Sequence, residues 1–327
     1  MEQRALVRVG REVGVVGLGA WQLGADWGEI GDADAAAVLD AAVDAGVTFV
    51  DTADVYGDGR SERSCGELLA RRPDAGILVA TKMGRRMPQL AENYIRENFN
   101  AWNDRSRRNL GVDTIDLVQL HCPPTSVYGD DRVFEVLDEM VAEGRIRHYG
   151  VSVETCEEAL VAIARPNVVS VQIILNCLRL KPLEQVLPAA LAAGVGIIAR
   201  VPLASGLLSG RYDEQTTFGP DDHRNYNRHG EAFDVGETFS GVPFEVGLEA
   251  VRRLAPIVPA GAATAQFALR WIIDQPGVTV VIPGARNAAQ ARSNAESAEL
   301  APLSQEQLAA VAEIYDQLVR PHVHQRW

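Results

Sequence analysis

The segment FVDTADVYG, residues 49–57, places an ionisable carboxylate inside a stretch with the character of a strand. Its first five residues suit a buried strand except for Asp51, whose charge is costly to bury unless a partner pairs with it. Tyr56 follows five residues after this carboxylate, in a turn next to a glycine. The segment therefore predicts a buried strand that ends beside a functional site.

Similar apolar runs recur along the chain and predict eight buried strands. They are 13–21, 48–53, 77–82, 115–121, 147–152, 170–175, 196–202 and 278–284. Amphipathic segments with capping residues lie between them and predict helices. These are 32–46, 61–72, 132–144, 154–164, 182–194, which Pro188 should kink or divide, and 261–274. The alternation predicts parallel strands with right-handed crossovers, and so one (β/α)8 TIM barrel domain over residues 1–327.

The first strand candidate contains GLGAWQLG, residues 17–24, in which Gly17-x-Gly19 resembles the start of a dinucleotide fingerprint. The next required glycine position holds Gln22, and the sequence that follows does not read as a helix. Since the fingerprint needs strand, turn and helix together, we exclude a Rossmann site here.

One long segment breaks the alternation. Residues 211–241 are polar, Gly-rich and aromatic, without a period. Long loops of this kind are usually lids or binding loops, although a disordered surface insertion is the alternative.

The composition limits the class of partner. The chain has 327 residues, 47 % of them apolar, a formal charge of −13 and a pI of about 5.0, which disfavours nucleic acid or an anionic membrane. Four scattered cysteines without paired spacing are typical of reduced thiols in a cytoplasmic protein. We expect no metal site, because His322 and His324 near the C-terminus lack further ligands. The Ala- and Arg-rich composition suggests a bacterial chain, and a homo-oligomer cannot be read from the sequence.

Polar residues follow almost every predicted strand at its carboxyl end, where parallel barrels hold their active sites. A single lysine or histidine in such a place is usually solvated or structural, but a whole ring of polar residues indicates a site. They are Asp51 and Tyr56, Lys82, His121, Ser152, Gln172 with Asn176, Arg200, and Arg286, which follows Pro283-Gly284.

The motifs around these residues resemble the aldo-keto reductases over nearly the whole chain. They are FVDTADVYG, VATKMG, DLVQLH, YGVS, PLASGLLSG (202–210) and IPGARNAAQARSN (282–294). The resemblance implies the (β/α)8 barrel and a catalytic tetrad of Asp51, Tyr56, Lys82 and His121. It implies reversible reduction of an aldehyde or ketone to an alcohol, with a small carbonyl compound as substrate.

The chemistry of this tetrad is coherent. Tyrosine, with an ordinary pKa of about 10, keeps its proton near neutral pH, and a neighbouring Lys82 ammonium should lower that pKa. Asp51 would keep Lys82 charged and oriented. His121 would hydrogen-bond the carbonyl oxygen, while a nicotinamide supplies the hydride to carbon.

The resemblance also implies a cofactor site. Ser152 and Gln172 should bind the carboxamide, and Leu203, Ser205 and Leu207 the pyrophosphate, mostly through backbone groups. Arg286 and Gln290 should lie beside the 2′-phosphate and Asn294 on the adenine; the set also includes Gly19, Trp21, Arg200 and Gly284. We expect Arg286 to begin a short helix whose N-terminus adds to anion attraction. We therefore predict NADPH rather than NADH as the cofactor.

The chain departs from the family pattern at three cofactor positions. Val153 replaces an asparagine that relatives often carry, Arg200 stands where many have an aromatic residue, and Gly284 replaces a common phosphate-binding lysine. We expect Arg200 to stack on the nicotinamide as a planar guanidinium or, alternatively, to pair with the pyrophosphate.

Two other functions stay open on the sequence. Lys82 could form a Schiff base as a lyase does, or the chain could be a nicotinamide-sensing regulatory subunit, as some members of this family are. For the substrate pocket, Trp21, Trp27 and Tyr128 are candidate wall residues. We expect the C-terminal tail to fold over the barrel mouth.

Overall fold

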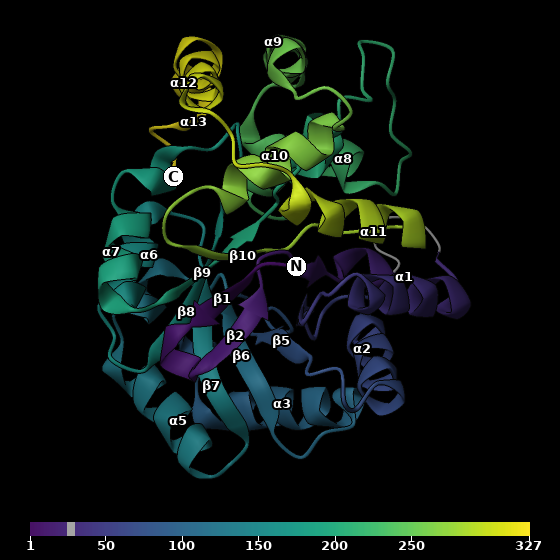
Figure 1. Cartoon of the computed structure of the whole chain (residues 1–327). Helices are drawn as coiled ribbons and strands as arrows, with labels where there is room; N and C mark the ends of the chain where they lie inside the picture. Colours follow the sequence, from purple (N-terminus) through teal and green to yellow (C-terminus); the bar gives the residue numbers. More distant parts are fainter. Residues whose placement is uncertain (25–29) are drawn as a thin grey trace.

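The computed structural model describes residues 1–24 and 30–327 and contains eight parallel strands in a nearly closed barrel (Figure 1). The strands are β3 Leu18–Gly19, β4 Phe49–Asp51, β5 Leu78–Met83, β6 Ile115–His121, β7 Ile146–Ser152, β8 Val168–Ile174, β9 Gly196–Arg200 and β10 Val278–Val281. Each pairs with its neighbour in chain order, and two isolated parallel bridges, Val16–Val281 and Gly19–Gly284, join the first strand to the last. The predicted (β/α)8 barrel is confirmed.

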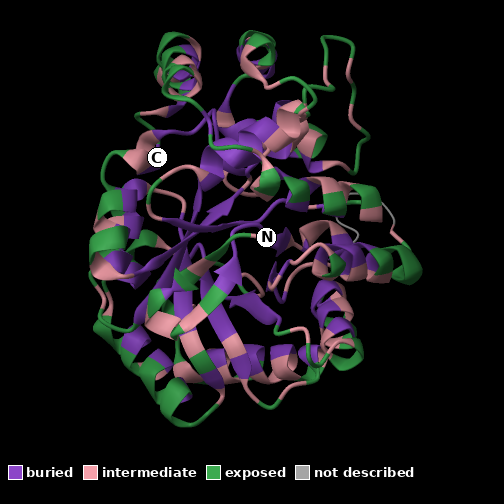
Figure 2. Ribbon diagram, viewed as in Figure 1, coloured by how far each residue is buried: buried purple, intermediate pink, exposed green. Residues whose placement is uncertain are grey.

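Helices surround the strands, with buried inner faces and exposed outer faces (Figure 2). The longer ones are α1 Asp32–Asp44, α2 Arg60–Arg71, α3 Arg96–Leu110, α5 Asp131–Ala142, α6 Cys156–Ile163, α7 Val186–Ala193, α9 Phe244–Leu254, α10 Thr264–Ile273, α11 Ala288–Glu296 and α12 Gln305–Ile314. The sequence prediction did not include α3, α9 or α12. Helix α3 has a mostly polar sequence, and its buried apolar residues are only Phe99, Trp102 and Leu110. Its apolar periodicity is therefore weak.

The predicted first strand, 13–21, is wrong as one element. Residues Arg11–Gly14 form β2, which pairs antiparallel with β1, Gln3–Leu6, and the barrel strand β3 begins only at Leu18. Leu6 and Val13 of this hairpin are fully buried in the same cluster as Phe49, Leu78 and Val280. The hairpin therefore closes the barrel at the end opposite the carboxyl ends of the strands.

The segment 182–194 is divided, as Pro188 suggested. A 3-10 turn over Lys181–Leu183 precedes α7, and Pro188 lies in the first turn of that helix. A proline is tolerated there because the first-turn N–H groups have no partner inside the helix.

The long loop 211–241 packs against the C-terminus of the chain. It contains α8, His223–Tyr226, and two 3-10 turns over Val235–Glu237 and Phe239–Gly241. The indole Nε1 of Trp327, which follows α13 (Arg320–Val323), lies 3.1 and 3.2 Å from the carboxylate oxygens of Asp234. The Arg179 guanidinium lies 3.7 Å from the centre of the same indole ring.

Within residues 1–24 and 30–327, no helix has the length and apolar character needed to cross a membrane.

Candidate active site

A cavity of about 660 Å³ opens at the carboxyl ends of the barrel strands, and most of the predicted site residues line it. These are Gly19, Trp21, Asp51, Tyr56, His121, Ser152, Gln172, Arg200, Leu203, Ser205, Gly284, Arg286, Gln290 and Asn294. Lys82 lies behind the lining, in contact with Asp51 and Tyr56. Leu207 does not line the cavity and its side chain packs in the core; the contact expected of its backbone stays a prediction.

Lys82 uses its three ammonium donors on three oxygens from the segment 51–56. Its Nζ lies 2.5 Å from Asp51 Oδ1, 2.9 Å from the carbonyl oxygen of Thr52 and 3.3 Å from the Tyr56 hydroxyl. Burial lowers the pKa of Lys82, but the attraction of Asp51 and Tyr56 outweighs it, and that pKa is raised. The lysine therefore stays an ammonium ion that bridges the carboxylate and the phenol.

The second oxygen of Asp51 accepts hydrogen bonds from two amide side chains. Gln172 Nε2 donates to Oδ2 at 2.7 Å and Gln119 Nε2 at 3.1 Å. Sequence reasoning missed Gln119, although it lies in the motif DLVQLH and pairs in register with Lys82. Because the Gln172 amide nitrogen is engaged here, only its amide oxygen is left for the predicted contact with a carboxamide.

Tyr56 stands in the turn after β4, and Gly57 allows that turn to pack closely. Gly57 has a φ of +57°, and a Cβ atom there would lie 2.1 Å from the carbonyl oxygen of Gly24. The Tyr56 ring stacks on Trp21 at 5.9 Å and meets His121 edge-on at 5.9 Å. Lys82 lowers the pKa of Tyr56, as expected, but burial raises it more. The net pKa is therefore raised rather than lowered, and the phenol keeps its proton.

His121 is a neutral imidazole beside this phenol. Burial, followed by the charges of Arg85, Lys82 and Arg200, lowers its pKa well below the ordinary value. Its Nδ1 atom is buried and meets no hydrogen-bond partner among the described residues. The neutral ring can therefore form a hydrogen bond with a ligand.

A network of two arginines and two glutamates lies next to His121. Arg200 Nη2 lies 2.8 Å from Glu154 Oε2 and Arg200 Nη1 lies 3.7 Å from Glu237 Oε1. Arg85 contacts the same two glutamates at 3.3 and 3.2 Å and donates to the His121 carbonyl oxygen at 3.2 Å. Because Arg200 already has two carboxylate partners, its geometry disfavours the alternative of pairing with a pyrophosphate; stacking on a nicotinamide stays a prediction.

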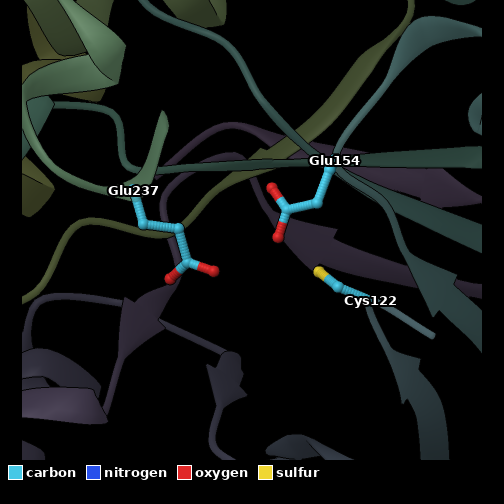
Figure 3. Close-up of side chains that lie close together, drawn as sticks. All are labelled: Cys122, Glu154 and Glu237. Atoms are coloured by element: carbon cyan, nitrogen blue, oxygen red, sulfur yellow. The ribbon is translucent and has the colours of Figure 1, made fainter. Parts of the chain in front are cut away.

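The same network brings Cys122, Glu154 and Glu237 together, as Figure 3 shows. Their potential ligand atoms lie within 4.8 Å of one another. Two guanidinium groups occupy the region between the carboxylates, and burial raises the pKa of Cys122 to about 12, so the thiol keeps its proton. A protonated thiol and carboxylates already paired with arginines are poor ligands for a metal ion.

Three further arginines among the described residues line the cavity. Arg211 and Arg224 come from the long loop, and Arg286 from the segment after β10. Arg286 does not begin the helix, contrary to expectation: Asn287 is the N-cap, whose side chain accepts from Gln290 N at 2.9 Å, and α11 starts one residue later. Sequence reasoning missed Arg211, which stands alone after PLASGLLSG without a local pattern.

The side chains of the predicted adenosine site also support the local backbone. Gln290 Oε1 accepts from the Arg286 backbone N–H at 2.8 Å, and Asn294 Nδ2 donates to the Gly284 carbonyl oxygen at 3.1 Å. At Gly284 a Cβ atom would lie 1.8 Å from Gln22 Oε1. A larger residue at position 284 would therefore require the end of the Gln22 side chain to move.

Ser205 anchors the long loop. Its Oγ donates to the Glu237 carbonyl oxygen at 2.9 Å and accepts from the Phe239 N–H at 3.2 Å. The backbone at Ser205 adopts a φ of +55°, which is uncommon outside glycine and marks a tightly shaped turn. Its hydroxyl is therefore engaged with the loop, and only its backbone is left for the predicted pyrophosphate contact.

The structure treats differently the three residues that were predicted to line the substrate pocket. Trp21 lines the cavity. Tyr128 does not, because it is buried behind the lining and its hydroxyl donates to the Ser152 carbonyl oxygen at 2.8 Å, so that prediction is wrong. Trp27 lies outside the described residues.

Comparison with known proteins identifies the family of this chain. The aldo/keto reductase family matches residues 15–316, and the chain belongs to this family of oxidoreductases. It is 30 % identical over 302 residues to aldo-keto reductase YhdN of Bacillus subtilis, covering 90 % of this chain and 88 % of that one. Among solved structures, a glycerol dehydrogenase from Gluconobacter oxydans is similar with a TM-score of 0.78, at 29 % identity and coverage of 98 % and 96 %. An aldo-keto reductase from Bacillus halodurans in its holo form has a TM-score of 0.76, at 26 % identity and coverage of 96 % for both chains.

Proposed function

We propose that the chain reduces an aldehyde or ketone to an alcohol, reversibly, with NADPH as cofactor and Tyr56 as proton donor. The observation that carries this proposal is the Lys82 ammonium, placed 2.5 Å from Asp51 Oδ1 and 3.3 Å from the Tyr56 hydroxyl. A protonated phenol next to a fixed positive charge can give its proton to a developing alkoxide, because the charge stabilises the phenolate that remains.

The roles of the other side chains follow from their positions. Neutral His121 would donate a hydrogen bond to the carbonyl oxygen beside Tyr56 and orient it. The nicotinamide, when bound, supplies the hydride. Ser152 and the amide oxygen of Gln172 would hold its carboxamide, while Arg286 and Arg211 would attract its phosphate groups and favour NADPH.

The geometry disfavours a Schiff-base lyase. Lys82 is 1 % exposed, its three donors are used, and its raised pKa keeps it protonated, whereas a Schiff base needs a free amine. A nicotinamide-sensing regulatory subunit would use the same cofactor site and can keep the same tetrad; copurifying membrane partners would favour it.

The test is a turnover assay with purified protein, NADPH and a panel of aldehydes and ketones, followed by loss of NADPH absorbance and identification of the alcohol. We expect turnover with NADPH to exceed that with NADH. Tight NADPH binding without any alcohol would contradict the reductase and favour the sensor, and a covalent adduct trapped on Lys82 by borohydride would favour the lyase.

A further inference from the structure

In the part of the cavity around the catalytic side chains, the charged side chains form ion pairs with one another. This part, which we call the catalytic end, is lined by Trp21, Tyr56, His121, Cys122 and Glu237. The first pair beside it is Lys82 with Asp51, described above. The second group is the network of Arg85, Arg200, Glu154 and Glu237, in which two guanidinium groups meet two glutamate side chains; burial raises the pKa of Glu154, whereas the pKa of Glu237 is lowered, since Arg85 and Arg200 outweigh its burial.

The network is shielded from solvent. The Arg200 side chain is 8 % exposed and Glu237 is 11 % exposed. Glu237 Oε1 lies 3.2 Å from Arg85 Nη2, and Glu154 bridges both arginines with its two oxygens. Removing one partner from such a group would leave a buried charge without compensation.

The remaining lining of the catalytic end carries no charge that could replace these arginines. Tyr56 and Cys122 keep their protons, His121 is neutral, and Trp21 and Ser152 are uncharged. Residues 25–29, which the structure does not describe, contain no lysine, arginine or histidine in the sequence. The other arginines of the described lining are Arg211, Arg224 and Arg286; Arg224 is already paired with Asp222, and Arg286 follows β10 beside the N-cap of α11.

We propose that the catalytic end selects uncharged aldehydes and ketones and discriminates against substrates that carry a carboxylate; this inference rests on the proposed function. A carboxylate entering here loses its hydration and meets cations that already have carboxylate partners. To recruit Arg200 it must displace Glu154 or Glu237, so the network acts against anionic substrates. Uncharged carbonyl compounds need no such rearrangement and can pack on Trp21.

The test compares meta-formylbenzamide with meta-formylbenzoate, two aldehydes of nearly the same shape that differ in charge. Both are assayed with the full chain and saturating NADPH, and kcat/KM is measured for each. We expect kcat/KM to be about 10- to 100-fold higher for the amide. The variant Glu237→Gln removes one negative charge from the network and should reduce this ratio, chiefly by raising kcat/KM for the benzoate.

A matched control is Glu214→Gln, in the same loop but at an exposed ion pair with Arg252, which should leave the ratio unchanged. Equal or better use of the benzoate, while the amide is turned over, would overturn the charge discrimination and leave the reductase intact. A ratio that Glu237→Gln does not move would remove the network as its cause. Failure to reduce either aldehyde, or any other carbonyl compound, would contradict the proposed function itself and this inference with it.

Discussion

Lys82 Nζ lies 2.5 Å from Asp51 Oδ1, and the two side chains are only 1 % and 4 % exposed to solvent. This ion pair compensates the carboxylate that the strand 49–51 buries. Lys82→Met should therefore destabilise the fold by about 3–5 kcal/mol, because Asp51 is left charged without its main partner. The free energy of unfolding in urea measures this effect.

A double variant measures the interaction energy between Asp51 and Lys82. Asp51→Asn together with Lys82→Met should cost less than the sum of the two single changes, because each single change leaves one uncompensated charge. Additive losses would show that the two charges do not interact in the folded chain.

The burial of Asp54, three residues after Asp51, should make the free energy of unfolding depend on pH. Its carboxyl group is fully buried, and burial, followed by the charge of Glu62, raises its pKa to about 7. The unfolded chain releases this proton at a pKa of about 3.9, so the folded chain binds more protons between pH ~4 and ~7. The free energy of unfolding should therefore fall as the pH rises through this window, and the loss is complete above pH ~7.

Asp54→Asn removes that dependence. At pH ~8 it should raise the free energy of unfolding by about 2–4 kcal/mol, and near pH ~4 it should change it little. Asp74→Asn, at an exposed carboxylate, is the control. Parallel pH profiles for wild type and Asp54→Asn would contradict a buried, protonated Asp54.

Arg286 should distinguish the two nicotinamide cofactors. Arg286→Ala should weaken NADPH binding by about 10- to 100-fold and NADH binding much less, because only NADPH carries the 2′-phosphate. Fluorescence titration measures both affinities, with Arg292→Ala on the exposed side of α11 as a control. Equal weakening of both cofactors would show that Arg286 does not contact that phosphate.

Trp327 should hold the loop segment 234–241 in place. Trp327→Ala removes two contacts with Asp234 and the packing on Arg179. Hydrogen exchange of the amides of 234–241 should become about tenfold faster, whereas Gln325→Ala, an exposed change in the same tail, should leave it unchanged. Unaltered exchange in Trp327→Ala would mean that other contacts fix the loop.

The barrel could be predicted because buried parallel strands read as separate apolar runs. The same reasoning merged the end of β2 with β3, since residues 13–18 form one apolar run and only tertiary pairing shows that residues 11–14 pair with β1. Helix α3 was missed because a polar sequence with three buried apolar residues gives little periodicity.

The candidate site was partly predictable for a related reason. Side chains at the ends of strands converge in a barrel, so Asp51, Lys82 and His121 could be grouped from their positions. The network of Arg85, Glu154, Arg200 and Glu237 could not, because its members lie far apart in the chain and each has an ordinary local context.

The most direct test of the proposed mechanism is Tyr56→Phe, which removes one hydroxyl and keeps the ring that packs on Trp21. NADPH affinity should stay within about twofold of the wild type, while the rate of carbonyl reduction should fall by about 100- to 10,000-fold, because the proton donor is lost. Undiminished reduction of a good substrate by this variant would contradict the assignment of Tyr56 as the acid.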